Sequence, residues 1–578
     1  MLEDSLTNDL VQPTRNAYSI SESFAKWLKS EKTMLFALLA FTMISWVPRI
    51  EGPLDLRWDG GVYYILGTSL AEGKGYKLLN EPGEISAVQY PPLFPLIIAG
   101  YQLILRTSDP TIVAGWLRVT FFLVSLVYIS AIFRLCKMYL SPPYAFLAAL
   151  LCPFTFHVYF LSDLCFPELL FSLTTVLFFI NNGKESSRNS SMASYILALA
   201  AFALRTIGLA LLIAWVLESV IKKQFKKALL RFVLVLIPVL CWQFYIASVE
   251  SGYGYNHPQY SYQRDAYMFY NVTYARNISL DNPFMPENGK AHVLGRIRYN
   301  VLKIPYKIGE SLLGTPFWAD ELSKTFHLTK DTTAILDRIE NASLDIAGLI
   351  VLTGLLVMFF KRQFVISIYV FVYLSAMCLV PFTEQFTRYL MPVIPFLIVP
   401  FVHFWLTVKN VMTRDNYSKK SKIYKYIFVA PILIVLLLQI VQFKIIISTE
   451  HQQVVYEDKQ HNVVKYKVFY GDTFTAFNLC VQYIRQHARA NDIVAAGTPH
   501  WIYLQTGLKA VMPPYEINYA RAQQQLESVP VKYLIIGKDV IASERYTVPV
   551  VQHFAQQWKM VYSTPRNEWT IYQHIDHE

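Results

Sequence analysis

The sequence predicts a polytopic α-helical membrane protein that carries a small α/β domain at its C-terminus. Of its 578 residues, 54% are hydrophobic and only 16% are charged, whereas soluble globular proteins carry nearer a quarter of charged residues. Apolar runs of roughly 17–25 residues, the length that crosses hydrocarbon, recur along the chain. From about residue 448 the composition becomes that of a soluble domain, with alternating helix and strand patterns.

The net charge of +11 does not indicate a nucleic-acid partner. The lysines and arginines cluster in short loops between the apolar runs, as the positive-inside rule requires of a membrane protein. The six cysteines lack the CxxC or Cys/His spacing of a zinc site and show no disulfide framework. We therefore expect membrane lipids around the protein, and neither a metal nor a cofactor within it.

A window of roughly 19 residues gives about eleven spans within residues 33–447. Residues 1–32 are expected to form a cytoplasmic tail with an interfacial helix, because they are polar and too long for a cleaved signal peptide. The segment 92–105 is apolar but short and contains Pro95, so we expect it to lie in the interface. With a cytoplasmic N-terminus, the basic loops all become cytoplasmic: 134–137, 184–188, 222–231, 361–362 and 409–425.

This orientation places two loops and the C-terminal domain outside the cytoplasm: 48–112, 250–344 and 448–578. It also brings five chemically interesting residues to the same face, although only loop charge was used to choose it: Asp59, Tyr90, Asp163, Arg205 and Arg388. We therefore expect an active site on the extracytoplasmic side of a bacterial inner or plasma membrane.

The C-terminal domain, 448–578, is expected to cover that outer face. Its pattern predicts two helices, two buried strands and a terminal hairpin: Thr473–Arg489, Pro499–Gly507, Asp492–Gly497, Val531–Gly537, and Trp558–Tyr562 with Trp569–Gln573. The turn at Gly497 lacks the GxGxxG pattern of a nucleotide-binding loop. No nucleotide site is therefore predicted.

Asp59 stands at the start of an amphipathic helical pattern. A carboxylate at a membrane surface can take the proton of a hydroxyl nucleophile and so act as a general base; the alternative is an N-cap, since Asp before a helix accepts backbone N–H groups. Gly73 and Gly75 are expected to end the helix. Lys74 between them is either a phosphate ligand or a solvated turn lysine.

Two more acids, Asp163 and Glu168, flank another outer turn. Acids so close to an apolar core indicate function, although Asp163 could instead cap the following helix. Arg205 has apolar neighbours on both sides and needs an anion, either Asp163 or a lipid phosphate. Arg388 opens a span; it could bind a phosphate in a bidentate manner, or snorkel to the interface with Tyr389 in an aromatic belt.

Tyr63 and Tyr90 lie close in sequence to Asp59 and to the Pro-Pro pair at 91–92. A pocket lined by aromatic rings beside Asp59 would suit a sugar. The alternatives are a helix start at the prolines and a further part of the aromatic belt.

In their order along the chain, these motifs resemble those of the GT-C membrane glycosyltransferases. The motifs are Asp59-x-x-x-Tyr63-Tyr64, SLAEGKGY, YPPLFPL, the LSD tripeptide ending at Asp163, LRTIGLAL around Arg205 and RYLMPVIPF around Arg388. The most similar branch uses dolichyl- or undecaprenyl-phosphate sugars and includes bacterial relatives of protein O-mannosyltransferase and of lipid A aminoarabinose transferase. The resemblance implies a GT-C-like helical bundle whose first outer loop carries the catalytic acid.

The resemblance also implies a reaction, namely inverting transfer of a hexose or pentose from a polyprenyl-phosphate donor to a hydroxyl of a lipid, glycan or protein. Asp59 would be the general base and Asp163 a second acid that orients a substrate. Arg205, Arg388 and Lys74 would bind the leaving phosphate, and four residues would line the substrate pocket: Tyr63, Tyr90, Glu168 and Tyr389. Many relatives have a second acid directly after the first, but here Gly60 and Gly61 follow, so neither a two-acid site nor a metal is expected in this loop.

The alternative function is a polytopic transporter or flippase of lipid-linked sugars. Many spans and intramembrane charges fit it. However, the sequence shows no internal repeat with paired broken helices, and its acids gather at one face rather than at the midplane.

Overall fold

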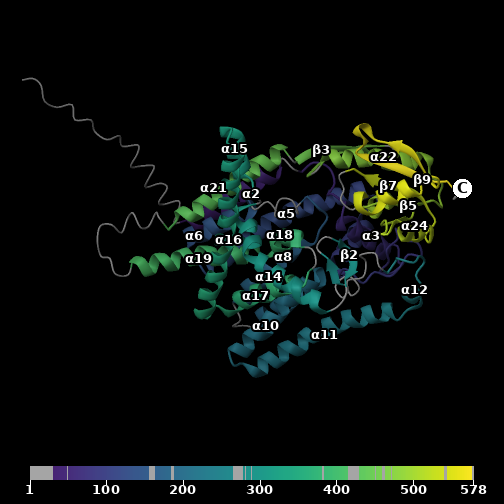
Figure 1. The fold of residues 1–578 in the computed structure, drawn as a ribbon. Helices are drawn as coiled ribbons and strands as arrows, with labels where there is room; N and C mark the ends of the chain where they lie inside the picture. Colours follow the sequence, from purple (N-terminus) through teal and green to yellow (C-terminus); the bar gives the residue numbers. More distant parts are fainter. Residues whose placement is uncertain are drawn as a thin grey trace, which may run out of the picture.

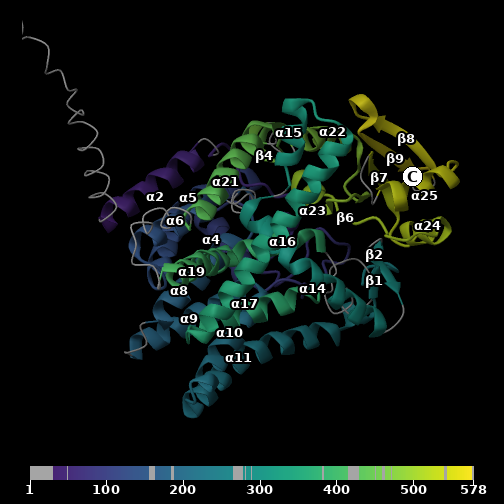
Figure 2. The same cartoon turned by 60° about the vertical axis from the view of Figure 1, so that its left-hand side comes forward.

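The computed structural model describes residues 30–575 except for these gaps: 48–49, 155–162, 184–187, 265–276, 280–281, 288–289, 315, 381–382, 414–427, 450, 459–461, 470 and 539–542. Three expectations lie partly or wholly outside the described residues: the N-terminal tail, the first two residues of the LSD tripeptide and most of the basic linker 409–425. The described chain forms a helical bundle with a small sheet domain at one end, which we call the sheet side (Figures 1 and 2).

Within the described residues, four helical segments are long and apolar enough to cross a membrane: α5 (Pro110–Lys137), α11 (Phe225–Glu250), α16 (Lys330–Phe360) and the run Phe386–Met412, which contains α18 (Phe386–Leu390), η5 (Met391–Val393) and most of α19 (Ile394–Thr413). Shorter apolar helices accompany them: α4 (Leu93–Leu105), α6 (Pro142–Leu151), α8 (Glu168–Asn182), α9 (Arg188–Leu204), α10 (Leu209–Ile221), α17 (Phe364–Met377) and α21 (Ala430–Thr449). The helical, membrane-embedded character is thus confirmed. The number of eleven spans is not, and it stays a prediction.

Local sequence signals account for the ends of the long helices. Asp109 caps α5 by accepting from the amide of Thr111, Pro110 occupies the first turn, and Arg134 and Lys137 lie in the last turn. Each of these residue types favours its end of the helix, because the cap binds free N–H groups and the cations face the negative end of the helix dipole.

The expected long polar loop 250–344 is more helical than the sequence suggested. α14 (Lys290–Leu313) is one helix of 24 residues, and α16 begins at Lys330, inside the expected loop. Glycines explain the close packing of the two helices. A Cβ on Gly309 would lie 1.9 Å from the Leu344 carbonyl oxygen, and one on Gly348 the same distance from that of Pro305, so the backbones approach as only small residues allow.

The sheet domain has five strands in the order β6-β5-β7-β9-β8. Four of them run in the same direction and β9 runs against them, with these bounds: β5 (Ile493–Ala495), β6 (Ala510–Val511), β7 (Val531–Gly537), β8 (Trp558–Ser563) and β9 (Trp569–His574). The predicted strand at 531–537 is confirmed, and the other predicted strands match within a few residues. β7 is buried throughout, as expected of a continuous apolar run in a sheet covered on both faces.

Helices α22 (Gly471–His487), α23 (Pro499–Thr506) and α24 (Tyr519–Glu527) accompany the sheet. The first two agree with the predicted helices to within two residues at each end. The sequence analysis missed an antiparallel hairpin between the bundle and this domain, formed by β3 (His451–Glu457) and β4 (Val463–Phe469).

Hydrogen bonds fix the sheet domain to the loop that precedes α4. Ala510 in β6 donates its amide to the Asn80 carbonyl at 2.9 Å, and the Asn80 side chain donates back to the Ala510 carbonyl at 3.2 Å. Lys509 bonds the Leu79 carbonyl at 2.7 Å and pairs with Glu84 at 3.0 Å. The last part of the chain therefore holds the first loop in a defined shape.

A third segment joins the same contact. The Tyr260 hydroxyl donates to the buried carboxylate of Glu81 at 2.7 Å, the Tyr262 hydroxyl to the Met512 carbonyl at 2.9 Å, and the Gln263 amide to the Pro82 carbonyl at 3.1 Å. Segments around residues 80, 260 and 510 thus converge on the sheet side of the bundle.

Candidate active site

Asp59 is the first residue of α3 (Asp59–Ala71), which lies on the sheet side of the bundle. The N-cap position belongs to Trp58, and no side chain caps the helix there, so the alternative role of Asp59 as an N-cap is wrong. Trp58 has φ of 60°, a left-handed conformation that is uncommon for a residue other than glycine. The chain therefore turns sharply just before the carboxylate. At the other end, Gly73 and Gly75 have positive φ after the helix, as predicted.

A buried ion pair anchors this turn. Arg57 binds the carboxylate of Asp55 through its Nη2 at 2.5 Å and its Nε at 2.7 Å, and its guanidinium lies 4.1 Å from the centre of the Phe474 ring in the sheet domain. Asp55 also donates its amide to the Asp163 carbonyl at 2.9 Å. The segments that lead into α3 and α8 are thereby fixed side by side.

The absence of a second acid after Asp59 has a packing reason. A Cβ on Gly60 would lie 3.0 Å from the Asp55 carbonyl oxygen. A Cβ on Gly61 would lie 2.7 Å from the Leu56 carbonyl oxygen and 2.9 Å from the Cβ of His500. No side chain fits at Gly61 without moving backbone, because contacts under 3.0 Å are repulsive.

Four charged side chains meet where α3, α8, α9 and α18 come together. Nη2 of Arg388 donates to Oδ2 of Asp59 at 2.5 Å and lies 3.6 Å from Oε1 of Glu168. Arg205, just after α9, binds the same oxygen of Glu168. We call these four residues the charge cluster; its two carboxylates and two guanidiniums balance in formal charge.

The surroundings keep Asp59 ionised. Burial acts to raise the pKa of Asp59, but the charges of Arg388 and Arg205 and a hydrogen bond from Tyr90 outweigh it, so that the pKa is lower than usual. Tyr63 packs on Tyr90 with ring centres 4.5 Å apart. The aromatic residues predicted beside Asp59 are thus next to it.

Two polar atoms of the charge cluster lack a partner among the described residues. Oε2 of Glu168 and Nε of Arg388 are buried and accept or donate no hydrogen bond. A buried polar atom without a partner costs about 1–3 kcal/mol. Such atoms call for an explanation, and one is that the cluster rearranges around a ligand.

An apolar groove opens beside the charge cluster. It has a volume of about 310 Å³ and lies between α10 and α17, with Arg205 and Tyr389 among its lining residues. The Tyr389 hydroxyl is bound to Gln385 at 2.9 Å. We call this space the α10–α17 groove. Its lining is mostly apolar, and the guanidinium of Arg205 is the cation that lines it among the described residues.

Some predicted site residues lie elsewhere. The exposed Lys74 pairs with Glu72 at 2.9 Å and takes no part in the charge cluster. Asp163 is buried and contributes its backbone carbonyl to Asp55. It does not cap the following helix, because α8 begins at Glu168 with Pro167 as its N-cap. Arg205 binds Glu168 in the described structure; the expectation that its anion is Asp163 or a lipid phosphate stays a prediction.

Sequence reasoning missed His500, which comes from α23 of the sheet domain and packs against Gly61 near Asp59. Burial lowers the pKa of His500 to about 4, although the charge of Asp59 acts to raise it, so the imidazole is neutral at pH 7. Nothing local in the sequence pairs position 500 with position 61. Among the described residues, no group of three or more His, Cys, Asp or Glu side chains could hold a metal ion.

Comparison with known proteins rests on structure alone. No protein-family model matches the sequence, and no curated protein matches it. The oligosaccharyltransferase of Archaeoglobus fulgidus in its apo form superposes with a TM-score of 0.52 at 12% identity, covering 95% of this chain and 75% of that one. The same enzyme, AglB, with an inhibitory peptide and a dolichol-phosphate gives 0.50 at 9% identity, covering 94% and 74%.

The chain has the GT-C fold. ArnT from Cupriavidus metallidurans bound to undecaprenyl phosphate is also similar, with a TM-score of 0.49, 12% identity and coverage of 94% of this chain and 98% of that one. The GT-C fold is what the sequence motifs predicted, and the charge cluster lies where the first loop of this GT-C fold meets three other helices.

Proposed function

We propose that this protein is a membrane glycosyltransferase that moves a sugar from a polyprenyl-phosphate donor to an acceptor hydroxyl, with Asp59 as general base and inversion at the sugar carbon. The observation that carries the proposal is the charge cluster together with the α10–α17 groove, which Arg205 of the cluster lines. A groove lined by apolar side chains suits a prenyl chain, and the guanidiniums of Arg205 and Arg388 suit its phosphate. Bound dolichol-phosphate and undecaprenyl phosphate in the AglB and ArnT structures are consistent with such a donor.

The reaction balances with these groups. The acceptor hydroxyl gives its proton to Asp59 while its oxygen forms a bond to the anomeric carbon of the sugar. The bond from that carbon to the phosphate oxygen breaks, and its electrons leave with the polyprenyl phosphate. The two arginines stabilise the charge that develops on the phosphate, and fixed cations do this best away from bulk water.

Binding of the donor would prepare Asp59 for this step. In the described structure Arg388 is engaged by Asp59 and Glu168, so a phosphate must compete with carboxylates for it. Once Arg388 turns to the phosphate, Asp59 loses its strongest counter-charge and its pKa rises. The carboxylate thereby becomes a stronger base when a donor is in place.

The remaining expectations fit around this centre. Asp163 positions Asp55 and, through it, the turn into α3. Tyr63 and Tyr90 flank the place where a sugar would lie next to Asp59. Lys74 is left out of the phosphate site, because it lies at an exposed turn. The sheet side would face away from the cytoplasm, as loop charge predicts.

The test is Asp59→Asn in the full-length protein, reconstituted with undecaprenyl-phosphate hexoses and pentoses and a membrane extract as acceptor source. We expect loss of transfer with unchanged binding of undecaprenyl phosphate. Asp109→Asn is the matched control, because Asp109 caps α5 on the same side and Asn caps a helix equally well. Transfer at the wild-type rate by Asp59→Asn contradicts the proposal.

A further inference from the structure

Two neighbouring cavities lie along one face of α11, apart from the α10–α17 groove. The residues of α11 that line them recur every three or four positions, which places them on one side of the helix: Pro238, Cys241, Trp242, Tyr245, Ser248 and Val249. From Pro238 to Val249 α11 rises about 17 Å. We call the two cavities together the α11 cleft.

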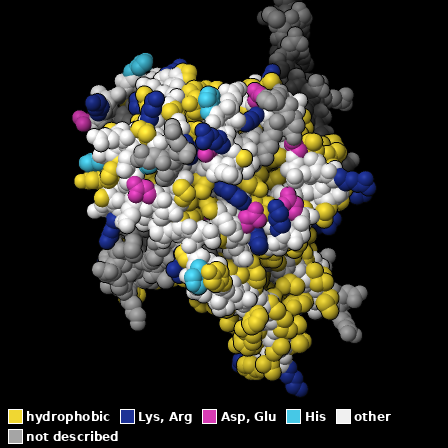
Figure 3. Space-filling view, turned by 90° about the vertical axis from the view of Figure 1, so that its right-hand side faces the viewer, with side chains coloured by type: hydrophobic (Ala, Val, Ile, Leu, Met, Phe, Trp, Pro, Cys, Tyr) yellow, Lys and Arg dark blue, Asp and Glu magenta, His cyan; other side chains and the backbone are white. Residues whose placement is uncertain are grey.

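The half of the α11 cleft nearer the middle of the bundle is apolar. It has a volume of about 430 Å³, and its other wall comes from α3, α4, α9 and the segment between α3 and α4, which contributes Tyr76, Pro91 and Pro92. The outward face of α11 is apolar as well, with Phe244 78% exposed. This helix forms the lowest part of the molecule in Figures 1 and 3, where hydrophobic side chains cover it, so the cleft borders a surface that faces lipid.

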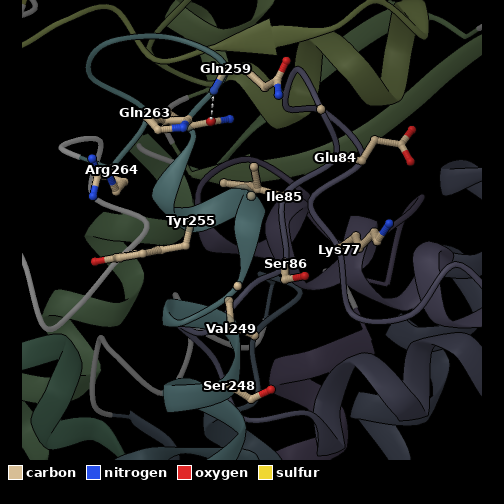
Figure 4. Close-up of a pocket in the computed structure, with 14 residues that line it drawn as sticks. Lys77, Glu84, Ile85, Ser86, Ser248, Val249, Tyr255, Gln259, Gln263 and Arg264 are labelled. Carbon is tan, nitrogen blue, oxygen red and sulfur yellow. Dashed lines mark hydrogen bonds between the residues drawn. The ribbon is translucent and has the colours of Figure 1, made fainter.

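The other half is polar and lies on the sheet side (Figure 4). Its volume is about 400 Å³, and the first loop and the segment after α11 line it with Lys77, Glu84, Ser86, Tyr255, Gln259 and Arg264. In Figure 4 Tyr255 and Arg264 lie on one side of this half, and Lys77 and Glu84 on the other. The guanidinium of Arg264 lies 5.4 Å from the centre of the Tyr255 ring.

A pair of tyrosines stands at the boundary between the halves, because Tyr76 and Tyr245 line the apolar half and the nearby Lys77 and Ser248 line the polar half. Tyr76 and Tyr245 pack edge to face with ring centres 6.4 Å apart. The Tyr245 hydroxyl donates to the Ala87 carbonyl and the Tyr76 hydroxyl to the Tyr90 carbonyl, each at 2.9 Å. Rings with a polar tip are typical of the level where hydrocarbon gives way to water. The α11 cleft therefore changes from apolar to polar at this level.

The polar half has an excess of positive charge. Glu84 pairs with Lys509 at 3.0 Å, so its charge is balanced from the sheet domain. Among the lining residues the two cations Lys77 and Arg264 outnumber the one acid, Glu84, on which the charges of Lys77 and Lys509 both act. Two cations, an aromatic ring and an amide at Gln259 suit an anionic head group that also carries hydroxyls.

We propose that the α11 cleft binds the acceptor, an anionic membrane amphiphile whose chains lie in the apolar half and whose hydroxyl-bearing head group lies in the polar half. This rests on the proposed transferase function. Pro91 and Pro92 line the apolar half directly after Tyr90, whose side chain bonds Asp59, so Tyr90 links this half to the base. The donor would occupy a different space, because the α11 cleft and the α10–α17 groove share no lining residue.

A native cysteine reports on the cleft. Cys241 lines the apolar half and is exposed, whereas the other five cysteines, all described, are buried. We would measure alkylation of Cys241 by N-ethylmaleimide in the delipidated full-length protein, with phosphatidylglycerol, phosphatidylcholine or undecaprenyl phosphate added. Phosphatidylglycerol should protect Cys241 roughly tenfold better than phosphatidylcholine, since each cation near a membrane surface favours an anionic lipid appreciably. Lys77→Gln with Arg264→Gln should remove that preference.

Two alanine positions give matched variants. Ala203→Phe narrows the α11 cleft and Ala376→Phe the α10–α17 groove. We expect the first to abolish protection by phosphatidylglycerol while undecaprenyl phosphate still binds, and the second to do the reverse. The inference is overturned by any of three results: both phospholipids protect Cys241 equally, only undecaprenyl phosphate protects it, or the protein transfers sugar only to a peptide. Failure of undecaprenyl phosphate to bind anywhere overturns the proposed function instead.

Discussion

Arg388 and Asp59 are 329 positions apart in the sequence, and their side chains meet at 2.5 Å. The contact joins α18, near the end of the bundle, to the first residue of α3. The same nitrogen of Arg388, Nη2, also lies 3.6 Å from Oε1 of Glu168. Two carboxylates therefore compete for one guanidinium. A guanidinium that two carboxylates share can turn to a third anion, such as a phosphate, at a moderate cost in free energy.

Arg388→Lys keeps the positive charge but loses the planar fork that grips a phosphate. We expect the donor KM to rise roughly tenfold or more, since hydrogen bonds to charged groups contribute about 1.5–3 kcal/mol. Arg388→Ala should raise it further. Steady-state kinetics with an undecaprenyl-phosphate sugar measure both, and an unchanged KM in both variants removes Arg388 from the donor site.

Glu168→Gln leaves Asp59 as the one carboxylate of the charge cluster beside its two guanidiniums. The empty protein should lose stability, and undecaprenyl phosphate should raise its Tm more than it raises that of the wild type, because a bound ligand stabilises only the folded state. The matched control is Glu218→Gln. Glu218 is a buried glutamate that binds Arg231 at 3.1 Å, but it lies at the other end of α10 from Arg205. A loss of stability without the larger ligand shift, or an equal shift in Glu218→Gln, shows that Glu168 is only structural.

Glu81 makes the junction of the three sheet-side segments sensitive to pH. Burial raises its pKa to about 7, although Tyr260, Gln263 and Lys509 act to lower it. Because the folded pKa lies above the unfolded value near 4.5, the stabilisation is complete below pH 4.5 and is lost as the pH rises through 7. At about 1.4 kcal/mol per pKa unit, the change is about 3 kcal/mol.

The variant Glu81→Gln cannot ionise and should flatten this dependence. Hydrogen exchange at the amide of Ala510, which bonds Asn80, reports on the junction directly. In the wild type it should become faster from pH 5 to pH 8, after correction for the intrinsic rate, and in Glu81→Gln it should not. A wild-type profile that stays flat over this range contradicts the prediction.

Gly61→Ala should separate α3 from the sheet domain. The added methyl group would lie 2.7 Å from the Leu56 carbonyl oxygen and 2.9 Å from Cβ of His500, and such overpacking costs about 1–3 kcal/mol. Gly100→Ala in α4 is the control, because nothing lies within 4 Å of its new Cβ and Ala favours a helix over Gly. Thermal unfolding of the two variants, measured under the same conditions, tests this. Equal Tm values would show that Leu56 and His500 move to accommodate the added methyl group at little cost in stability.

Much of the candidate site could be predicted because each of its charged residues is recognisable from the residues next to it in the sequence. Asp59, Arg205 and Arg388 are charges beside apolar runs, and loop charge alone sorted them to one face. The partner of Arg205 could not be chosen in the same way, since Asp163 and Glu168 are both acids in one turn. Pro167 was the local signal that could have located the start of α8. The residue before a proline disfavours a helical conformation, and proline itself is tolerated in the first turn of a helix. Pro167 therefore predicts a helix that starts near Glu168. In the structure this start places the Glu168 carboxylate beside the arginines.

Other features depend on distant contacts that no local pattern encodes. The packing of His500 on Gly61 joins residues from the two ends of the chain, and the length of α14 depends on close contact between its Gly309 and Leu344 of α16. The α11 cleft has the same character, because its walls come from α3, α4, α9 and α11. Periodicity in one segment cannot reveal what faces it.

The pairing of Asn80 with Ala510 has a consequence for how the protein is made. A ribosome delivers residue 80 to the membrane long before it has translated residue 510, so the early loop must wait, unsupported, while the intervening helices insert. Contacts of such sequence separation form late and slowly. A nascent chain released before that point would lie in the bilayer without the contacts that the sheet domain makes to its first loop.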